Sequence, residues 1–196
     1  MELICEVSMR HVHLTTAQIE ELFGKGKSLT PQRMLSQPGQ FLAAERVDLV
    51  GPKGTMQRVA IIGPERSAAQ VELSRTDCFV LGIADVPLRQ SGDLGGSAGI
   101  TIKGTNSQIK IDTGVILAHR HVHLDPDTAK KNGLDDGQIV SIKFEGDRQA
   151  ILCNTIVRVD ENFAPAIHID SDEANAVGFD SVTPCTLLRK LRILCE

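Results

Sequence analysis

Two copies of one pentapeptide, Arg-His-Val-His-Leu, hold four of the six histidines in this sequence, at residues 10–14 and 120–124. On a β-strand, residues i and i+2 face the same side about 6.6 Å apart, so His11 and His13 share a face, as do His121 and His123. Two such imidazoles can bind one metal ion, and a catalytic zinc usually takes three protein ligands and keeps one position open. A single copy would more often be an ordinary half-exposed strand. An identical second copy favours two metal sites.

Each histidine pair then needs a third ligand. His168 is the best candidate for one pair, because the isoleucines of the segment 166–170 take one strand face and His168 takes the other. A carboxylate must serve the other pair, and Glu72 is expected to lie opposite the core-facing Val71 and Leu73. A solvated strand carboxylate fits the pattern at Glu72 equally well. His119 lies too far along its strand to be a comfortable ligand and is expected behind the metal ligands.

Three arginines lie near these candidates in the sequence. Arg66 could offer a planar guanidinium fork to phosphate, although a lone arginine is by default a surface residue. Arg10 and Arg120 adjoin the histidine pairs but are expected on the opposite strand face, where salt bridges are their ordinary role.

Each histidine strand is followed by a helix-start signal. Thr15 with Gln18 suits a capping box, and Asp125 followed by Pro126 suits an N-cap with proline at the first helical position. The glycines expected to end these two helices are Gly24 and Gly133. A further helix is expected after Ile169, capped by Asp170 or Ser171 and closed by Gly178.

The rest of the sequence is rich in short β patterns with closely spaced turns. The expected strands are 41–50, 55–62, 70–74, 100–103, 108–111, 115–124, 138–144, 148–159 and 166–169. Many short strands favour barrels over a parallel sheet with crossover helices. The predicted fold is therefore mainly β, with two small β-barrels and short capping α-helices built around the internal repeat. Segments 24–40 and 89–99 are expected to be surface loops.

Composition excludes several functional classes. The net charge is −4, there is no Trp or Tyr, and the basic residues are dispersed, so nucleic-acid binding is not expected. Neither a signal sequence nor an apolar run long enough to span a membrane is present. The five cysteines are scattered without a Cys-x-x-Cys spacing, which suits a reducing cytoplasm better than a disulfide framework.

The chain resembles the PduL-type phosphate propanoyltransferases, phosphotransacylases associated with bacterial microcompartments, propanediol degradation and related cytoplasmic routes. The resemblance rests on the two pentapeptides with their flanks, on Pro64-Glu65-Arg66 through Asp77, on Ser91-Gly92-Asp93-Leu94, and on the segment 168–175. These separated blocks lie in the right order over nearly the whole chain.

The resemblance implies specific roles for these residues. One zinc would be held by His11, His13 and Glu72 and would receive the coenzyme A sulfur. A second zinc would be held by His121, His123 and His168, and Arg66 would grip phosphate. Ser91 and Gly92 would lie near coenzyme A.

The resemblance also implies two barrels, a discontinuous one from residues 1–9 plus 118–196 and a second one from the central residues 10–117. The resemblance further implies a homodimer as the basic unit, alone or within a higher homo-oligomer. Microcompartment members carry a targeting extension ahead of the first histidine strand. Here that strand starts at Met1, which favours the cytoplasm over a microcompartment lumen.

These features together predict an enzyme that exchanges acyl-CoA and phosphate for acyl phosphate and coenzyme A. Two Zn²⁺ and one carboxylate would give a formal charge of about +3, which attracts anionic substrates. Three alternatives remain from the residues alone. A zinc hydrolase would use the same metals, and a non-catalytic module would use zinc to pin the barrels together. A cupin-type dioxygenase fits poorly, because the first glutamate after His13 is Glu20, on an expected helix.

Overall fold

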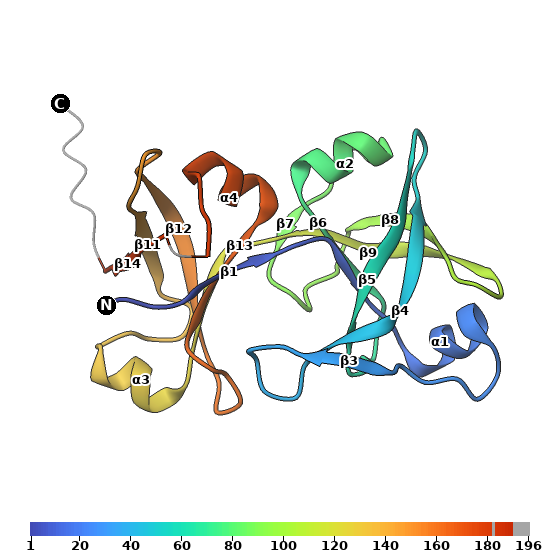
Figure 1. The fold of residues 1–196 in the computed structure, drawn as a ribbon, viewed down its shortest axis with the longest axis horizontal. Helices are drawn as coiled ribbons and strands as arrows, with labels where there is room; N and C mark the ends of the chain where they lie inside the picture. Colours follow the sequence, from blue (N-terminus) through green and yellow to red (C-terminus); the bar gives the residue numbers. More distant parts are fainter. Residues whose placement is uncertain (182, 190–196) are drawn as a thin grey trace. The chain divides into compact units, whose positions relative to one another are not determined.

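The computed structural model describes residues 1–181 and 183–189, so Cys195 lies outside the described residues. The chain forms two compact units. The central unit comprises residues 9–118, and the terminal unit combines residues 1–8 with the chain from residue 119 onward. Figure 1 shows that sheet strands dominate both units and that the helices are short. The prediction of a mainly β fold with short helices is confirmed.

Six strands of the central unit close into a ring. The ring runs β4 (Phe41–Val50), β5 (Thr55–Gly63), β2 (His11–His13), β6 (Gln70–Leu73), β9 (Gln108–Ala118) and β8 (Ala98–Lys103), and β8 pairs with β4 again. Two short strands, β3 (Pro31–Met34) and β7 (Leu88–Arg89), lie outside the ring on β4 and β9. Closure leaves the ring strands without unpaired edges. Its interior is apolar and includes the fully buried Val12, Ile61 and Val71.

The terminal unit has a second, barrel-like sheet. Its order is β1 (Cys5–Ser8), β13 (Ala166–Asp170), β10 (His121–Leu124), β12 (Ala150–Val159), β11 (Ile139–Phe144) and β14 (Cys185–Leu188). An isolated bridge between Glu2 and Thr186 joins the segment before β1 to β14. Val122, Ile142 and Ile167 are fully buried in its core.

The two units repeat one plan. The order β1-β13-β10-β12-β11-β14 corresponds strand for strand to β9-β6-β2-β5-β4-β8, and each successive pair has the same parallel or antiparallel sense. Strand β1 directly precedes β2 in the chain but pairs in the terminal unit, whereas β9 directly precedes β10 but pairs in the central unit. The repeats have therefore exchanged their first strands.

In the described part of the chain, four short helices follow strands of this plan: α1 (Thr16–Phe23), α2 (Arg75–Leu81), α3 (Pro126–Lys131) and α4 (Ser171–Val177). The Thr15 capping box of α1, the Asp125 cap of α3 and the Asp170 cap of α4 agree with the sequence prediction. Helix α3 ends at Lys131 with Asn132 as its C-cap, one residue before the expected Gly133. Among the described residues, none of the helices is long and apolar enough to span a membrane.

Some elements differ from those predicted. The strand expected over 115–124 is divided at residues 119 and 120, because β9 and β10 belong to different units. Helix α2 was not predicted, although Ser74 and Asp77 form a capping box at its start. The segment 24–40 contains β3, and β14 was also missed.

The turn between β8 and β9 packs against the end of α1. The amide of Asn106 donates to the Leu22 carbonyl, and the Ser107 hydroxyl donates to the Glu21 carbonyl at 2.6 Å. These bonds satisfy carbonyls that the end of a helix leaves exposed. A side chain at Gly104 would overlap the Leu22 carbonyl oxygen and come within 2.8 Å of the Leu22 Cβ. The close approach therefore requires glycine.

We predict that Gly104→Ala lowers the free energy of unfolding by about 1–3 kcal/mol, because overpacking moves the backbone of the α1 end. Urea unfolding measures the change. Gly95→Ala is the matched control, since its added methyl would meet nothing nearer than an Asp93 oxygen at 3.9 Å. Equal unfolding midpoints for Gly104→Ala and the control would contradict the prediction.

Candidate metal centres

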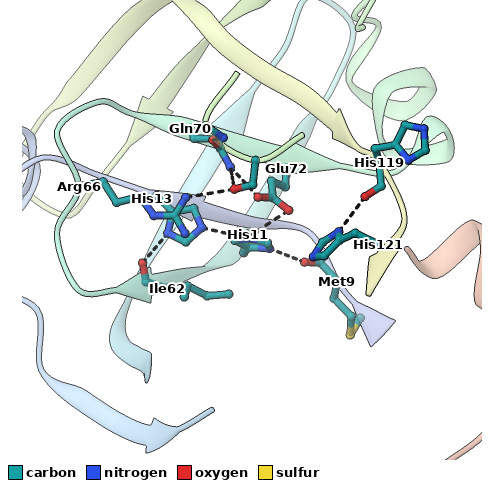
Figure 2. Close-up of polar contacts among 11 residues, drawn as sticks. Met9, His11, His13, Ile62, Arg66, Gln70, Glu72, His119 and His121 are labelled. Atoms are coloured by element: carbon teal, nitrogen blue, oxygen red, sulfur yellow. Dashed lines mark hydrogen bonds and ion pairs between the residues drawn. The ribbon is translucent and has the colours of Figure 1, made fainter. Parts of the chain in front are cut away.

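The first group of donors lies in the central unit, on strands β2 and β6. Antiparallel pairing places His11 opposite Glu72 and His13 opposite Gln70. The Nε2 atom of His11 lies 3.2 Å from Nε2 of His13 and 3.6 Å from a carboxylate oxygen of Glu72. Figure 2 shows these side chains converging, and all three are buried. Their ligand atoms lie within 4.8 Å of one another, close enough to bind one metal ion.

Backbone carbonyls orient both imidazoles of this group. The Nδ1 of His11 donates to the Met9 carbonyl at 2.8 Å, and the Nδ1 of His13 donates to the Ile62 carbonyl at 2.9 Å (Figure 2). A carbonyl can only accept, so in the neutral imidazole the proton lies on Nδ1 and the Nε2 lone pair is available to a cation. Metal-binding histidines are typically held in this way.

Electrostatics within this group favours an ionised Glu72 carboxylate and a neutral His13 imidazole. Burial would raise the pKa of Glu72, but the adjacent His11 outweighs burial and holds this pKa well below its usual range. Burial would lower the pKa of His11, but the Glu72 carboxylate outweighs burial and raises this pKa above its usual value. Burial and then the charge of His11 hold the pKa of His13 well below its usual value. Glu72 and His13 are therefore in the protonation states that metal ligation needs.

The second group of donors lies in the terminal unit, on strands β10 and β13. Antiparallel pairing places His121 opposite His168. The ring centroid of His123 lies 4.5 Å from that of His121 and 4.8 Å from that of His168. One nitrogen of each ring lies within 4.8 Å of the others, so three imidazoles can bind one cation. The ring of His123 also stacks on Phe163, with centroids 3.9 Å apart.

A carbonyl again orients the first histidine of the second pair. The Nδ1 of His121 donates to the His119 carbonyl at 2.8 Å, as Figure 2 shows. The ring of His119 instead bonds to the Arg120 carbonyl and to Asn154. His119 thus orients a candidate ligand through its backbone and does not belong to the convergent group.

A hydrogen-bond network surrounds Glu72 and includes Arg66 and Ser91. Arg66 Nη1 donates to the Ser91 hydroxyl oxygen at 3.2 Å, and Gln70 Nε2 donates to the same oxygen at 2.8 Å. Gln70 Nε2 also donates to Glu72 at 2.5 Å, and the Gly92 amide donates to Gln70 at 2.8 Å. The structure therefore brings Arg66, Ser91 and Gly92 to the Glu72 side of the first group. Sequence reasoning missed Gln70, although its position two residues before Glu72 places both on one strand face.

Comparison with known proteins matches residues 4–180 to the family model described as phosphate propanoyltransferase. The chain belongs to this family. The matched residues include both groups of donors and Arg66.

Individual phosphate propanoyltransferases are similar over most of their length. The chain is 49% identical to the phosphate propanoyltransferase of Thermotoga maritima over 175 residues, which cover 89% of this chain and 83% of the relative. It is 47% identical to that of Enterococcus faecalis over 173 residues, covering 88% and 82%. It is also 47% identical to that of Leptotrichia buccalis over 176 residues, covering 90% and 83%.

We predict that this phosphate propanoyltransferase family member binds two zinc ions per chain and that His123→Ala binds one. With only two of its three donors, the second site binds zinc too weakly to keep the ion during a chelator wash and gel filtration. Elemental analysis after a limited chelator wash and gel filtration measures the zinc content per chain. His119→Ala is the matched control and should keep two, because its ring lies outside the convergent group. Equal zinc content in His123→Ala and the wild type would contradict the assignment.

Proposed function

We propose that the protein is a zinc-dependent phosphate acyltransferase that converts acyl-CoA and phosphate into acyl phosphate and coenzyme A, and the reverse. The observation that carries the proposal is the presence of two convergent three-donor groups in a chain of the phosphate propanoyltransferase family. Propanoyl-CoA and acetyl-CoA are the proposed acyl donors.

The donor chemistry of both groups suits zinc. Imidazole nitrogen and carboxylate oxygen are common zinc ligands, and three protein ligands leave a position for substrate. His11, His13 and Glu72 would hold one ion, and His121, His123 and His168 would hold the other. Bound zinc would supply positive charge for oxygen or sulfur atoms that become negative during transfer.

Arg66 is the proposed phosphate-binding residue. A guanidinium offers donors in a planar fork that matches two phosphate oxygens. The bond between Arg66 and the Ser91 hydroxyl, together with the bonds from Gln70 to Ser91 and Glu72, links this fork to the candidate ligand Glu72. Phosphate held by Arg66 would therefore be close to the first donor group, and Ser91 and Gly92 would lie beside coenzyme A.

Transfer then proceeds by direct attack. A phosphate oxygen forms a bond to the thioester carbonyl carbon, the carbon–sulfur bond breaks, and coenzyme A leaves as thiolate. Holding both reactants in the reactive geometry lowers the barrier by avoiding the loss of freedom that a bimolecular encounter requires. Phosphate is itself the nucleophile, so no cysteine acyl-enzyme is needed.

The proposal extends to assembly. We propose that the protein forms a homodimer or a higher homo-oligomer in the cytoplasm. Phe79 and Val80 on α2 support self-association, because these large apolar side chains are exposed on the single chain. Large exposed apolar groups commonly mark interaction surfaces.

We predict that thiol release from propanoyl-CoA and acetyl-CoA requires phosphate. A thiol reagent measures release from acetyl-, propanoyl- and butanoyl-CoA, with and without phosphate, on zinc-replete protein. His123→Ala should lose phosphate-dependent release. Equal release without phosphate would instead identify a thioester hydrolase and overturn the transferase assignment.

We also predict that Arg66→Ala lowers kcat/KM by roughly 10²–10³-fold, as expected when a preorganised charged donor to the reacting group is removed. Arg66→Lys should recover part of the loss, because lysine restores the charge without the fork. Arg33→Ala, at an exposed position on β3, is the control and should behave as the wild type. Full activity in Arg66→Ala with unchanged zinc content would remove Arg66 from the site.

A further inference from the structure

Each candidate metal centre has an arginine directly before its histidine pair, and both arginines bind a carboxylate. In the central unit, Nε and Nη2 of Arg10 lie 2.8 Å and 2.6 Å from the same oxygen of Asp77. In the terminal unit, Nη1 of Arg120 donates to Glu173, and its Nε donates to the Cys153 carbonyl at 2.7 Å. The opposite-face salt bridges expected from the sequence are therefore present, and their partners are now known.

The two carboxylates occupy equivalent places in the repeated plan. Asp77 forms a capping box with Ser74, the N-cap of α2, and Glu173 forms one with Asp170, the N-cap of α4. Ser74 comes two residues after Glu72, and Asp170 comes two residues after His168. Each arginine thus ties the histidine strand to the turn that directly follows the third donor.

We propose that Arg10 and Arg120 are positioning residues that hold the third metal ligand against its histidine pair. This proposal rests on the proposed binding of zinc at the two donor groups. The strands that carry the donors are short, with three residues in β2 and four in β6, so few ladder bonds fix their separation. A second tie at the strand end restrains the distance from His11 to Glu72, and from His121 to His168.

Burial makes the tie in the central unit a strong restraint. The Asp77 side chain is 2% exposed, so its charge depends on Arg10 and on the Ser74 amide, which donates to it within the capping box, for compensation. The tie in the terminal unit gains strength differently, because Arg120 also binds the carbonyl of Cys153 on β12, a neighbour of β10. One residue type in one position thus performs the same task with different local contacts.

Comparison of the two units indicates that these salt bridges serve the metal-binding geometry and are not ordinary surface ion pairs. Between the two units the third donor differs, Glu72 against His168, and so does the preceding same-face residue, Gln70 against Ala166. The arginine and the acidic residue of the capping box are nevertheless present in both. The salt bridge is therefore present wherever three donors converge, whether the third donor is a carboxylate or an imidazole.

The test measures zinc release from one site at a time. The His123→Ala background keeps only the first donor group intact. In this background, Arg10→Gln should release zinc to a chromogenic chelator on the order of 10–100-fold faster than His123→Ala alone. This factor is typical for the loss of residues that orient metal ligands. In a His13→Ala background, Arg120→Gln should do the same at the second group. Lys143→Gln, which breaks an ion pair with Glu145 in the terminal unit, is the matched control and should release zinc at the background rate.

Unfolding of the metal-free variants distinguishes positioning from general stability. A positioning role predicts faster zinc release even when the unfolding midpoints of the metal-free proteins agree. If Arg10→Gln does not fold, Arg10→Lys is a milder variant. It should release zinc at a rate between those of the background and Arg10→Gln, because one ammonium cannot reproduce the two guanidinium contacts. Unchanged release from Arg10→Gln and Arg120→Gln, or from Arg10→Lys where the former is unfolded, would overturn the proposal. Wild-type protein that takes up no zinc would instead overturn the proposed metal centres.

Discussion

Cross-strand register is the constraint on which both candidate centres depend. Directly opposite residues on antiparallel strands have Cβ atoms about 4.5–5.5 Å apart, so the pairs His11–Glu72 and His121–His168 are brought together by strand pairing alone. A slip of one residue would turn the third donor to the other face of the sheet. The closed ring of the central unit and the capped helices after the donor strands all oppose such a slip.

The exchanged strands explain why the third donors are shielded, with Glu72 buried and His168 partly buried. Strand β9 covers the outer side of β6, and β1 covers the outer side of β13, so each third donor lies on a strand with neighbours on both sides. Without β1 or β9, β13 or β6 would be a sheet edge open to solvent. Burial between neighbours in turn strengthens the attraction between His11 and Glu72, because little water screens it. One topological feature thus shapes both the geometry and the electrostatics of the central group.

The sequence revealed the fold class and the convergent residues because both leave local marks. Alternating apolar residues mark the short strands, and the identical pentapeptides mark equivalent strands in two units. The break at residues 119 and 120 leaves no such mark, since no glycine or proline interrupts residues 115–124 and only the pairing partners change. Helix α2 and Gln70 were missed for related reasons. The strand expected over 70–74 included Ser74, which is the N-cap of α2, and the importance of Gln70 depends on Ser91, which is distant in the sequence. Metal ligation and the role of Arg66 stay predictions.

The differences between the two groups follow from two changes within a common frame, Glu72 against His168 and Gln70 against Ala166. Zinc held by three neutral imidazoles would keep its full double charge, whereas zinc held with Glu72 would lose one unit. The central unit places Arg66 in the hydrogen-bond network of Glu72, through Ser91 and Gln70, which restores that unit of positive charge beside the carboxylate. The terminal unit has Ala166 where the central unit has Gln70, so the equivalent side chain cannot build this network there. A carboxylate ligand in the central unit is therefore compatible with binding an anionic substrate, because the residue two positions before it brings a cation to the same group.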